Sequence, residues 1–373
     1  MPSSALDYIT VQGFKSIASI EKLPLRQLNL LIGPNGSGKS NFIGVFSFLH
    51  EIREGRLKDY VTAAGGAEKV LHFSSKTTKE ISVYLSFEDE QKDYKLDLSP
   101  TADDGLFPSS EFVYYRDKGH GLPKPYEVRL SSVNQGLEAG ISDPRNGSSA
   151  SWVRERLGRW RLYHVHDTSS SSPMRKTAKV DDNEFLRENG SNLAAFLYLL
   201  REKHYESYNL IQRTVQRAAP FFDDFQLRPL NLRPDDIKLE WRHKKSDQYF
   251  DASSLSDGTL RFIALATLFL QPVAYRPSVI LVDEPELGLH PYAIEMLASL
   301  MRQAAVETQL IVSTQSSLLL DHFDPVDVLV ADRIDGGTQL VRQDPERLAS
   351  WLKDYSLGQL WEKNEIGGRP ARD

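Results

Sequence analysis

A glycine-rich octapeptide constrains the fold of this chain more than any other feature. Residues 33–40 read Gly-Pro-Asn-Gly-Ser-Gly-Lys-Ser and match the pattern G-x-x-x-x-G-K-S at every fixed position. The β-prone run Leu28–Ile32 precedes it, and apolar residues at helical spacing follow it. Because a strand, a glycine turn and a helix in this order form a phosphate-binding loop, we predict one here rather than a turn that only caps a helix.

The chemistry of this loop gives each residue an expected role. Glycines let the backbone N–H groups point inward at a phosphate, and the helix N-terminus adds partial positive charge. We expect Lys39 to reach the β- and γ-phosphates and the Ser40 hydroxyl to coordinate Mg²⁺. The expected nucleotide-binding residues are Gly33, Pro34, Asn35, Gly36, Ser37, Gly38, Lys39, Ser40 and Asn41.

A second pattern is an apolar run that ends in two acids. Val279–Val282 reads as a strand buried on both faces, and Asp283 and Glu284 follow it. Two carboxylates in this position are costly unless a cation meets them. We therefore expect Asp283 to hold Mg²⁺, directly or through water, and Glu284 to orient and deprotonate an attacking water. The alternative is a surface turn in which Glu284 is solvated.

The sequence favours ATP as the nucleotide. Guanine specificity usually comes with an N-K-x-D loop, which the chain lacks. A small-molecule kinase is possible in principle, but a long insertion between the phosphate loop and the acidic strand is unusual for that class. We therefore expect ATP and Mg²⁺ as the cofactors.

Composition excludes several other classes of protein. The chain has 373 residues, a net charge of -6 and no cysteine. Disulfide scaffolds, cysteine-ligated zinc, iron–sulfur clusters and a cysteine nucleophile are therefore excluded. The longest apolar stretch, Phe262–Leu270, is too short to span a bilayer, and the N-terminus does not resemble a signal peptide. We expect a globular cytoplasmic protein without a membrane partner.

The order of strand and helix patterns predicts an α/β fold. Glu80–Phe87 and Tyr94–Leu98 read as antiparallel strands, whereas Pro, Gly, Ser and Asp from about Ser99 to Ser151 predict an irregular insertion. Further patterns predict helices over Leu193–Leu200 and Tyr205–Ala218, a helix after Pro291, and strands over Leu310–Ser313 and Val328–Ala331.

Residues 255–259 add a resemblance to a known family. Leu-Ser-Asp-Gly-Thr is similar to the signature loop of ATP-binding-cassette (ABC) ATPases. In that family the loop contacts the γ-phosphate held by the other subunit, which implies nucleotide contacts for Ser256 and Gly258. A helix that Ser256 or Asp257 merely caps is the simpler alternative, and both can be true.

Other motifs narrow the resemblance to one branch. Ile9–Ile17 together with Leu28–Asn41 resembles the chromosome-maintenance and recombination-repair ATPases. Glu284–Pro291 resembles the overcoming-lysogenization-defect ATPases and related phage-defence ATPases. The segments Trp351–Gly358 and Gly367–Pro370 resemble uncharacterised bacterial predicted ATPases of the AAA family.

The resemblance implies a two-lobed ABC-type ATPase head, a P-loop NTPase fold with a mixed and helical insertion. We expect an N-terminal lobe over residues 1–98, the insertion over 99–232, a C-terminal lobe over 233–345 and a tail over 346–373. It also implies a homodimer that sandwiches ATP between two heads, with higher oligomers open.

Two departures from the family pattern affect catalysis. Gln315 stands where the family has a switch histidine; it can hydrogen-bond a γ-phosphate but cannot carry a proton charge. The second-lobe glutamine is missing, since the first glutamine after the phosphate loop is Gln91. We expect slow or partner-dependent hydrolysis with Lys39, Glu284 and Gln315 as the catalytic residues. For His290 we leave open a satisfied loop histidine and a contact across the dimer.

Three functions are consistent with these motifs. The first is an ATPase that regulates a separate effector, a Toprim-type nuclease or a toxin, in antiphage defence; only about forty residues follow Ala331, too few for a fused Toprim domain. The second is a DNA-binding repair or recombination ATPase that acts as a clamp. The third is a nucleotide sensor that does not hydrolyse ATP.

Basic residues between Arg154 and Lys179, interleaved with Trp152, Trp160 and Tyr163, are a possible DNA contact. A second basic cluster is Arg242–Lys245. A solvated charged face is the alternative for both.

Overall fold

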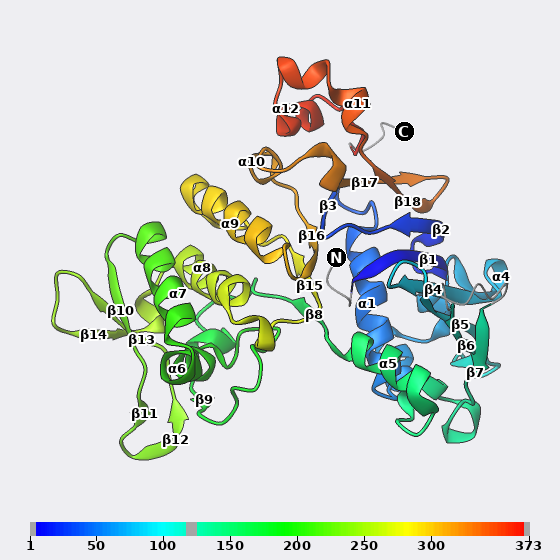
Figure 1. The fold of residues 1–373 in the computed structure, drawn as a ribbon, viewed down its shortest axis with the longest axis horizontal. Coiled ribbons are helices and arrows are strands. Elements are labelled where there is room, and N and C mark those ends of the chain that lie inside the picture. Colours follow the sequence, from blue (N-terminus) through cyan, green and yellow to red (C-terminus); the bar gives the residue numbers. More distant parts are fainter. Residues whose placement is uncertain (1–4, 117–124, 369–373) are drawn as a thin grey trace.

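The fold of the computed structural model is built on two sheets that meet around one helix (Figure 1). The structure describes residues 5–116 and 125–368. Helix α1 (Lys39–Arg53) lies between a parallel sheet and an antiparallel sheet, and its buried residues include Phe42, Phe46 and Leu49. These are residues of the apolar pattern that predicts the helix.

The parallel sheet has the strand order β18-β17-β3-β16-β15-β8. All pairs are parallel except β17 with β18. The strands are β3 (Leu28–Ile32), β8 (Trp160–Tyr163), β15 (Val279–Asp283), β16 (Gln309–Ser313), β17 (Val328–Ile334) and β18 (Gly337–Arg342). The predicted α/β fold and the predicted strands at residues 28, 279, 310 and 328 are confirmed.

The antiparallel sheet has the order β2-β1-β4-β5-β6-β7. Its strands are β1 (Leu6–Phe14), β2 (Ile17–Pro24), β4 (Ile81–Phe87), β5 (Lys92–Pro100), β6 (Leu106–Tyr115) and β7 (Tyr126–Arg129). The prediction of irregular structure from Ser99 is therefore wrong for β6, which pairs with β5 along most of its length. Helix α5 (Gly147–Gly158) also falls in that stretch. The boundary expected at residue 98 lies inside β5.

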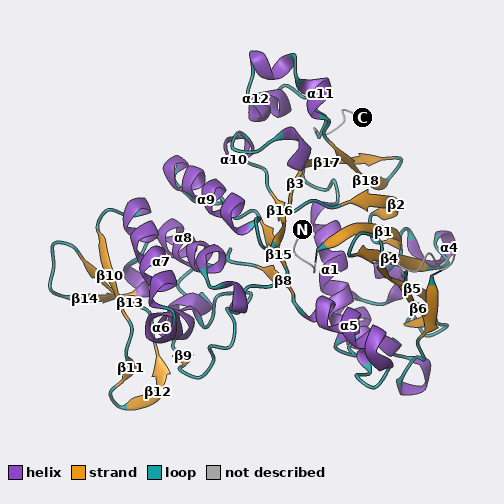
Figure 2. Cartoon of the chain, viewed as in Figure 1, coloured by secondary structure: helices purple, strands orange, loops and turns teal. Residues whose placement is uncertain are grey.

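A helical lobe covers the other face of the parallel sheet (Figure 2). Its helices are α6 (Leu193–Lys203), α7 (Tyr205–Ala218), α8 (Asp257–Leu270) and α9 (Pro291–Ala304). Two small sheets complete it: β10 (Phe222–Gln226), β13 (Glu240–His243) and β14 (Tyr249–Asp251), and β9 (Ala178–Lys179), β11 (Pro229–Leu230) and β12 (Arg233–Ile237). The boundary expected at residue 232 falls in the turn between β11 and β12.

The remaining α-helices are short. Three follow α1 in the chain: α2 (Leu57–Ala64), α3 (Ala67–Val70) and α4 (Ser74–Thr77). Three belong to the C-terminal part: α10 (Ser317–Leu320), α11 (Pro345–Leu348) and α12 (Leu357–Glu362). The C-terminal helices pack on β3 and β17 through Leu348, Leu357 and Leu360. Within the described ranges, no helix is both long enough and apolar enough to cross a membrane.

Candidate nucleotide-binding site

The site lies at one edge of the parallel sheet. Strand β16 pairs with β3 on one side and β15 on the other. The carboxyl ends of parallel strands meet at the same edge, so the topology gathers the segments that follow these three strands. They are the phosphate loop after β3, Asp283 and Glu284 at β15, and Gln315 after β16.

The octapeptide forms a tight turn into α1. Gly36 and Gly38 have φ of +80° and +102°, in the left-handed region that favours glycine. The Lys39 ammonium donates to the carbonyl oxygens of Gly33 at 2.6 Å and Pro34 at 3.0 Å. Burial lowers the pKa of Lys39, whereas the carboxylates of Glu284 and Asp283 raise it. The lysine is therefore held in the loop and faces the acidic strand.

Hydrogen bonds from the β17–β18 hairpin support the phosphate loop. Thr338 on β18 donates its hydroxyl to the Ser37 carbonyl at 2.9 Å and lies 2.7 Å from the Ser16 hydroxyl. Asn41 donates to the same Ser16 hydroxyl at 2.7 Å. A Cβ at Gly38 would overlap the Thr338 hydroxyl, so only glycine fits there.

The acidic strand presents its two carboxylates differently. Asp283 accepts a hydrogen bond from the Ser313 hydroxyl, and Gln315 donates its side-chain amide to the Glu284 carboxylate. Glu284 has φ of +41°, and its N–H donates to the Ser313 carbonyl at 2.9 Å. The structure thus brings together the expected catalytic pair, Glu284 and Gln315, on neighbouring strand ends.

The donor set suits Mg²⁺ bound together with a nucleotide. Ser40 and Asp283 offer a hydroxyl and a carboxylate, the hard oxygen ligands that Mg²⁺ takes alongside water and substrate phosphates. Among the residues that the structure describes, no cluster of three His, Cys, Asp or Glu side chains could hold a metal alone. The Ser37 hydroxyl, buried inside the loop, has no hydrogen-bond partner in the protein. These features fit the predicted Mg²⁺–nucleotide site.

The signature segment begins helix α8. Ser256 caps α8 by accepting from the Thr259 N–H at 3.2 Å, and its side chain is exposed. A Cβ on Gly258 would overlap the carbonyl oxygen of Gly288. Helix α8 packs in the cluster that includes Ile280 and Val282, whereas α1 packs in the cluster that includes Leu281. Ser256 and Lys39 therefore belong to helices on opposite faces of the sheet.

A buried arginine joins α8 to the segment after the acidic strand. Arg261 is 7% exposed and donates to the carbonyl oxygens of Val165, His166 and Leu287. Burial lowers its pKa. The three acceptors belong to the loops that follow β8 and β15, so Arg261 holds both loops against the signature helix.

His290 is satisfied within its own loop. It caps α9, and its Nδ1 accepts from the Tyr292 N–H at 3.3 Å. The ring is exposed, so a contact across a dimer stays a prediction.

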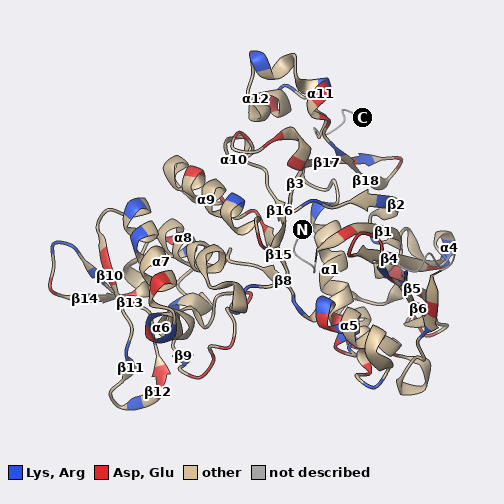
Figure 3. Cartoon of the chain, viewed as in Figure 1, with Lys and Arg blue, Asp and Glu red and all other residues tan. Residues whose placement is uncertain are grey.

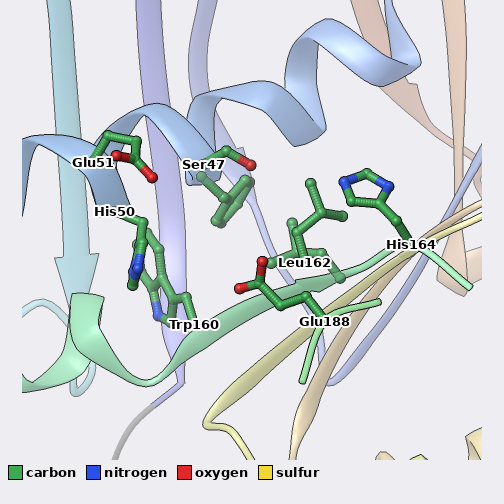
Figure 4. Close-up of a pocket in the computed structure, with 9 residues that line it drawn as sticks. Ser47, His50, Glu51, Trp160, Leu162, His164 and Glu188 are labelled. Atoms are coloured by element: carbon green, nitrogen blue, oxygen red, sulfur yellow. The ribbon is translucent and has the colours of Figure 1, made fainter. Parts of the chain in front are cut away.

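His164 also lies at the site and was not predicted from the sequence. Strand β8 pairs with β15 with Tyr163 opposite Val282. Leu162 and Leu281 line one cavity of about 70 Å³ beside α1, together with His164 (Figure 4). Side chains two residues apart on a strand face the same side, so His164 shares the face of Asp283 and α1. The alternation Leu162-Tyr163-His164-Val165-His166 is the signal that could have found it.

Most of the predicted basic region is used inside the molecule. Arg175 donates to the carbonyl oxygens of Thr168, Ala252 and Leu255 and pairs with Asp257 at 2.9 Å. Arg156 lies over the Trp152 ring, 4.6 Å from its centroid. Figure 3 shows acidic and basic residues mixed around α5. DNA contact through Arg154–Lys179 remains a prediction. Fewer basic side chains of this region are free to contact DNA than the sequence suggests.

The sequence matches a family described as an AAA domain, putative AbiEii toxin, type IV TA system, over residues 28–321. This span is most of the chain and contains the phosphate loop, the signature segment and the acidic strand. The chain belongs to this AAA-domain family. The match agrees with an ABC-type ATPase of the overcoming-lysogenization-defect and chromosome-maintenance branch, as the motifs imply.

Two curated relatives are similar to this AAA-domain protein. An OLD nuclease of Thermus scotoductus is 22% identical over 97% of the chain and 69% of its own length. A putative ABC transporter ATP-binding protein of Geobacter sulfurreducens is 28% identical over 35% of the chain and 54% of its own length. The chain therefore spans about half to two thirds of the length of these relatives.

Solved structures share the fold. A SmcHead bound to the C-winged helix domain of ScpA matches with a TM-score of 0.59 and 16% identity, over 92% of this chain and 99% of that chain. A Smc head domain with an extended coiled coil, bound to the C-terminal domain of ScpA and derived from Pyrococcus furiosus, gives 0.57 at 16% identity, over 95% and 99%. The predicted ABC-type ATPase head, a P-loop NTPase fold, is confirmed.

Proposed function

We propose that this AAA-domain protein binds Mg²⁺–ATP at the phosphate loop and hydrolyses it. One observation carries the proposal: Lys39, Asp283, Glu284 and Gln315 converge from three adjacent strand ends at one edge of the sheet. A phosphate-binding loop alone would be enough for a protein that binds ATP without hydrolysing it. A carboxylate beside the loop can in addition act as the general base that takes a proton from the attacking water.

Each residue then has a role in the proposed reaction. The Lys39 ammonium donates hydrogen bonds to loop carbonyls in this structure and would turn to the β- and γ-phosphates when ATP is bound. Glu284 takes the proton of the attacking water while the Gln315 amide fixes its carboxylate. Ser40 and Asp283 would hold Mg²⁺, which neutralises charge developing on the phosphates. His164, on the same face as Asp283, would orient water beside them.

We further propose that two heads share two nucleotides. Ser256 caps a helix on the opposite face of the sheet from α1, yet its exposed hydroxyl and the α8 N-terminus suit an anion. A contact of Ser256 and Gly258 with the γ-phosphate bound by a second copy would explain both the position of Ser256 on the face opposite α1 and the suitability of this helix start for an anion. Hydrolysis would then remove the shared ligand and release the interface.

The proposed biological role is control of a separate effector, a nuclease or toxin, in cytoplasmic antiphage defence. The similarity to an OLD nuclease along almost the whole chain supports it. The similarity of fold to the Smc heads favours the alternative, a DNA-binding clamp. Contacts of Arg156 with Trp152 and of Arg175 with Asp257 weaken this alternative, because they engage these arginines within the protein. Turnover stimulated by DNA alone would favour the clamp.

Steady-state ATP turnover together with ATP binding tests the enzymatic part. Lys39→Ala should abolish Mg²⁺–ATP binding, since no other cation in the loop replaces it. Glu284→Gln should bind ATP normally and lose turnover by about 100-fold or more, the usual contribution of a general base. His164→Ala should lower turnover. Normal turnover by Glu284→Gln would overturn the proposal.

A further inference from the structure

An exposed aromatic ring lies on the β17–β18 hairpin that contacts the phosphate loop, outside the catalytic residues described above. Phe73 is 53% exposed, more than any other phenylalanine of the residues that the structure describes. Its ring rests on the β17–β18 turn, where a Cβ added to Gly336 would lie 2.7 Å from the ring Cζ. It also lies against the His72 ring, with 4.3 Å between the centroids.

The surrounding backbone fixes this ring in place. Phe73 and Ser74 have φ of +52° and +72°, which is rare for two consecutive residues other than glycine. His72 is anchored on both sides: its N–H donates to the Gly13 carbonyl at 2.9 Å, and its Nδ1 lies 2.8 Å from the Lys15 carbonyl. Unfavourable backbone conformations of this kind persist where surrounding contacts impose them, often at ligand-binding positions.

Contacts connect this position to the start of α1. Gly336, under the Phe73 ring, is two residues from Thr338, which bonds to Ser37 and Ser16. Thr338 also donates its N–H to the Ser16 carbonyl at 2.7 Å. The ring is thus separated from the phosphate loop by one short stretch of the hairpin.

The expected orientation of a bound nucleotide also points its base toward the hairpin on which Phe73 lies. Glu284 and Gln315 follow β15 and β16, so in the proposed function the terminal phosphate points toward that side of β3. The other end of the nucleotide then points toward the opposite neighbours of β3, which are β17 and β18. The exposed ring of Phe73 lies on the tip of that hairpin.

We propose that Phe73 is the base-stacking residue of the site and that it takes a purine base on its exposed face. This inference rests on the proposed function and extends it from the phosphates to the nucleoside. An aromatic face stacks on any base, and one such contact is worth about a ten-fold change in affinity. Phe73 would therefore strengthen binding of nucleotides and leave binding of bare phosphate chains unchanged.

The test compares Mg²⁺–ATP with Mg²⁺–tripolyphosphate by titration calorimetry. Phe73→Ala should weaken ATP binding about ten-fold and change tripolyphosphate binding by less than about two-fold. Phe73→Asn should do the same, because asparagine tolerates the left-handed backbone while removing the ring. Phe73→Trp should keep ATP affinity. Tyr126→Ala, at an aromatic that is 66% exposed on β7, is the matched control and should change neither affinity.

The two proposals fail in different ways. If Phe73→Ala and Phe73→Asn bind ATP as the wild type does, base stacking is wrong and the phosphate site stands. Equal weakening of ATP and tripolyphosphate would show that Phe73 only supports the loop, which also overturns stacking. Binding of neither ligand by the wild type would contradict the proposed function itself.

Discussion

At the scale of single residues, the site depends on carboxylates whose surroundings differ. Glu284 is partly exposed and tied to Gln315. Glu286, two residues on, is 6% exposed; it accepts from the Thr314 hydroxyl at 2.6 Å and from the Gln315 N–H at 3.2 Å. Burial raises the pKa of Glu286. Glu286 thus holds the main chain of the residue that orients Glu284.

This raised pKa predicts a pH effect on stability. A carboxyl whose pKa is higher in the folded than in the unfolded state contributes stability below its unfolded pKa and loses it as pH rises through the folded pKa. Glu286→Gln keeps an acceptor for Thr314 and removes the titration. Relative to this variant, the wild type should lose about 1.4 kcal/mol of unfolding free energy per unit of raised pKa as pH rises from the unfolded pKa of a glutamate, about 4.3, through the higher folded pKa. Denaturant unfolding at several pH values measures the difference, and parallel curves for both proteins would contradict the prediction.

At the scale of elements, helix α8 is positioned by contacts that tolerate little change. A Cβ on Gly258 in its first turn would overlap the Gly288 carbonyl oxygen, and Arg261 one turn later donates to three backbone carbonyls. The start of the signature helix is therefore coupled to the loop that follows Glu284. This coupling requires a residue without a side chain at position 258.

Gly258→Ala should destabilise the fold by about 1–3 kcal/mol, because the added methyl overlaps a backbone oxygen. It should retain ATP binding at Lys39 and lose turnover, since the signature contact is displaced. Gly44→Ala is the matched control: a Cβ at Gly44 in α1 meets nothing within 4 Å, and alanine favours a helix interior. Thermal unfolding and turnover check both variants. An unchanged melting temperature and normal turnover for Gly258→Ala would show that α8 tolerates displacement.

Sequence patterns predicted the elements whose chemistry is local. Patterns of only a few neighbouring residues predict the phosphate loop, the acidic strand and the helices at residues 193 and 205. Strand β6 was missed because Pro108, Ser109 and Ser110 hide its alternation, while pairing with β5 decides its conformation. His164 and Phe73 were missed because their importance arises only when β8 joins β15 and when the C-terminal hairpin folds over the N-terminal loop.

At the scale of the whole molecule, the account requires two copies of the chain. One head places Lys39 and Ser256 on helices at opposite faces of its sheet. In the proposed dimer, a complete site combines Lys39 and Glu284 of one copy with Ser256 and Gly258 of another. Glu284→Gln should retain ATP and hold the two copies together, whereas Ser256→Arg should bind ATP and prevent pairing because a bulky side chain fills the phosphate contact.

The most direct test is the molar mass of Glu284→Gln by light scattering with and without Mg²⁺–ATP. The account predicts one chain without nucleotide and two with it, and one chain in both conditions for the double variant Glu284→Gln, Ser256→Arg. If another interface joins the chains permanently, a distance probe between heads replaces mass and should report closure on ATP. Heads that bind ATP in Glu284→Gln yet neither pair nor approach each other would contradict the central claim.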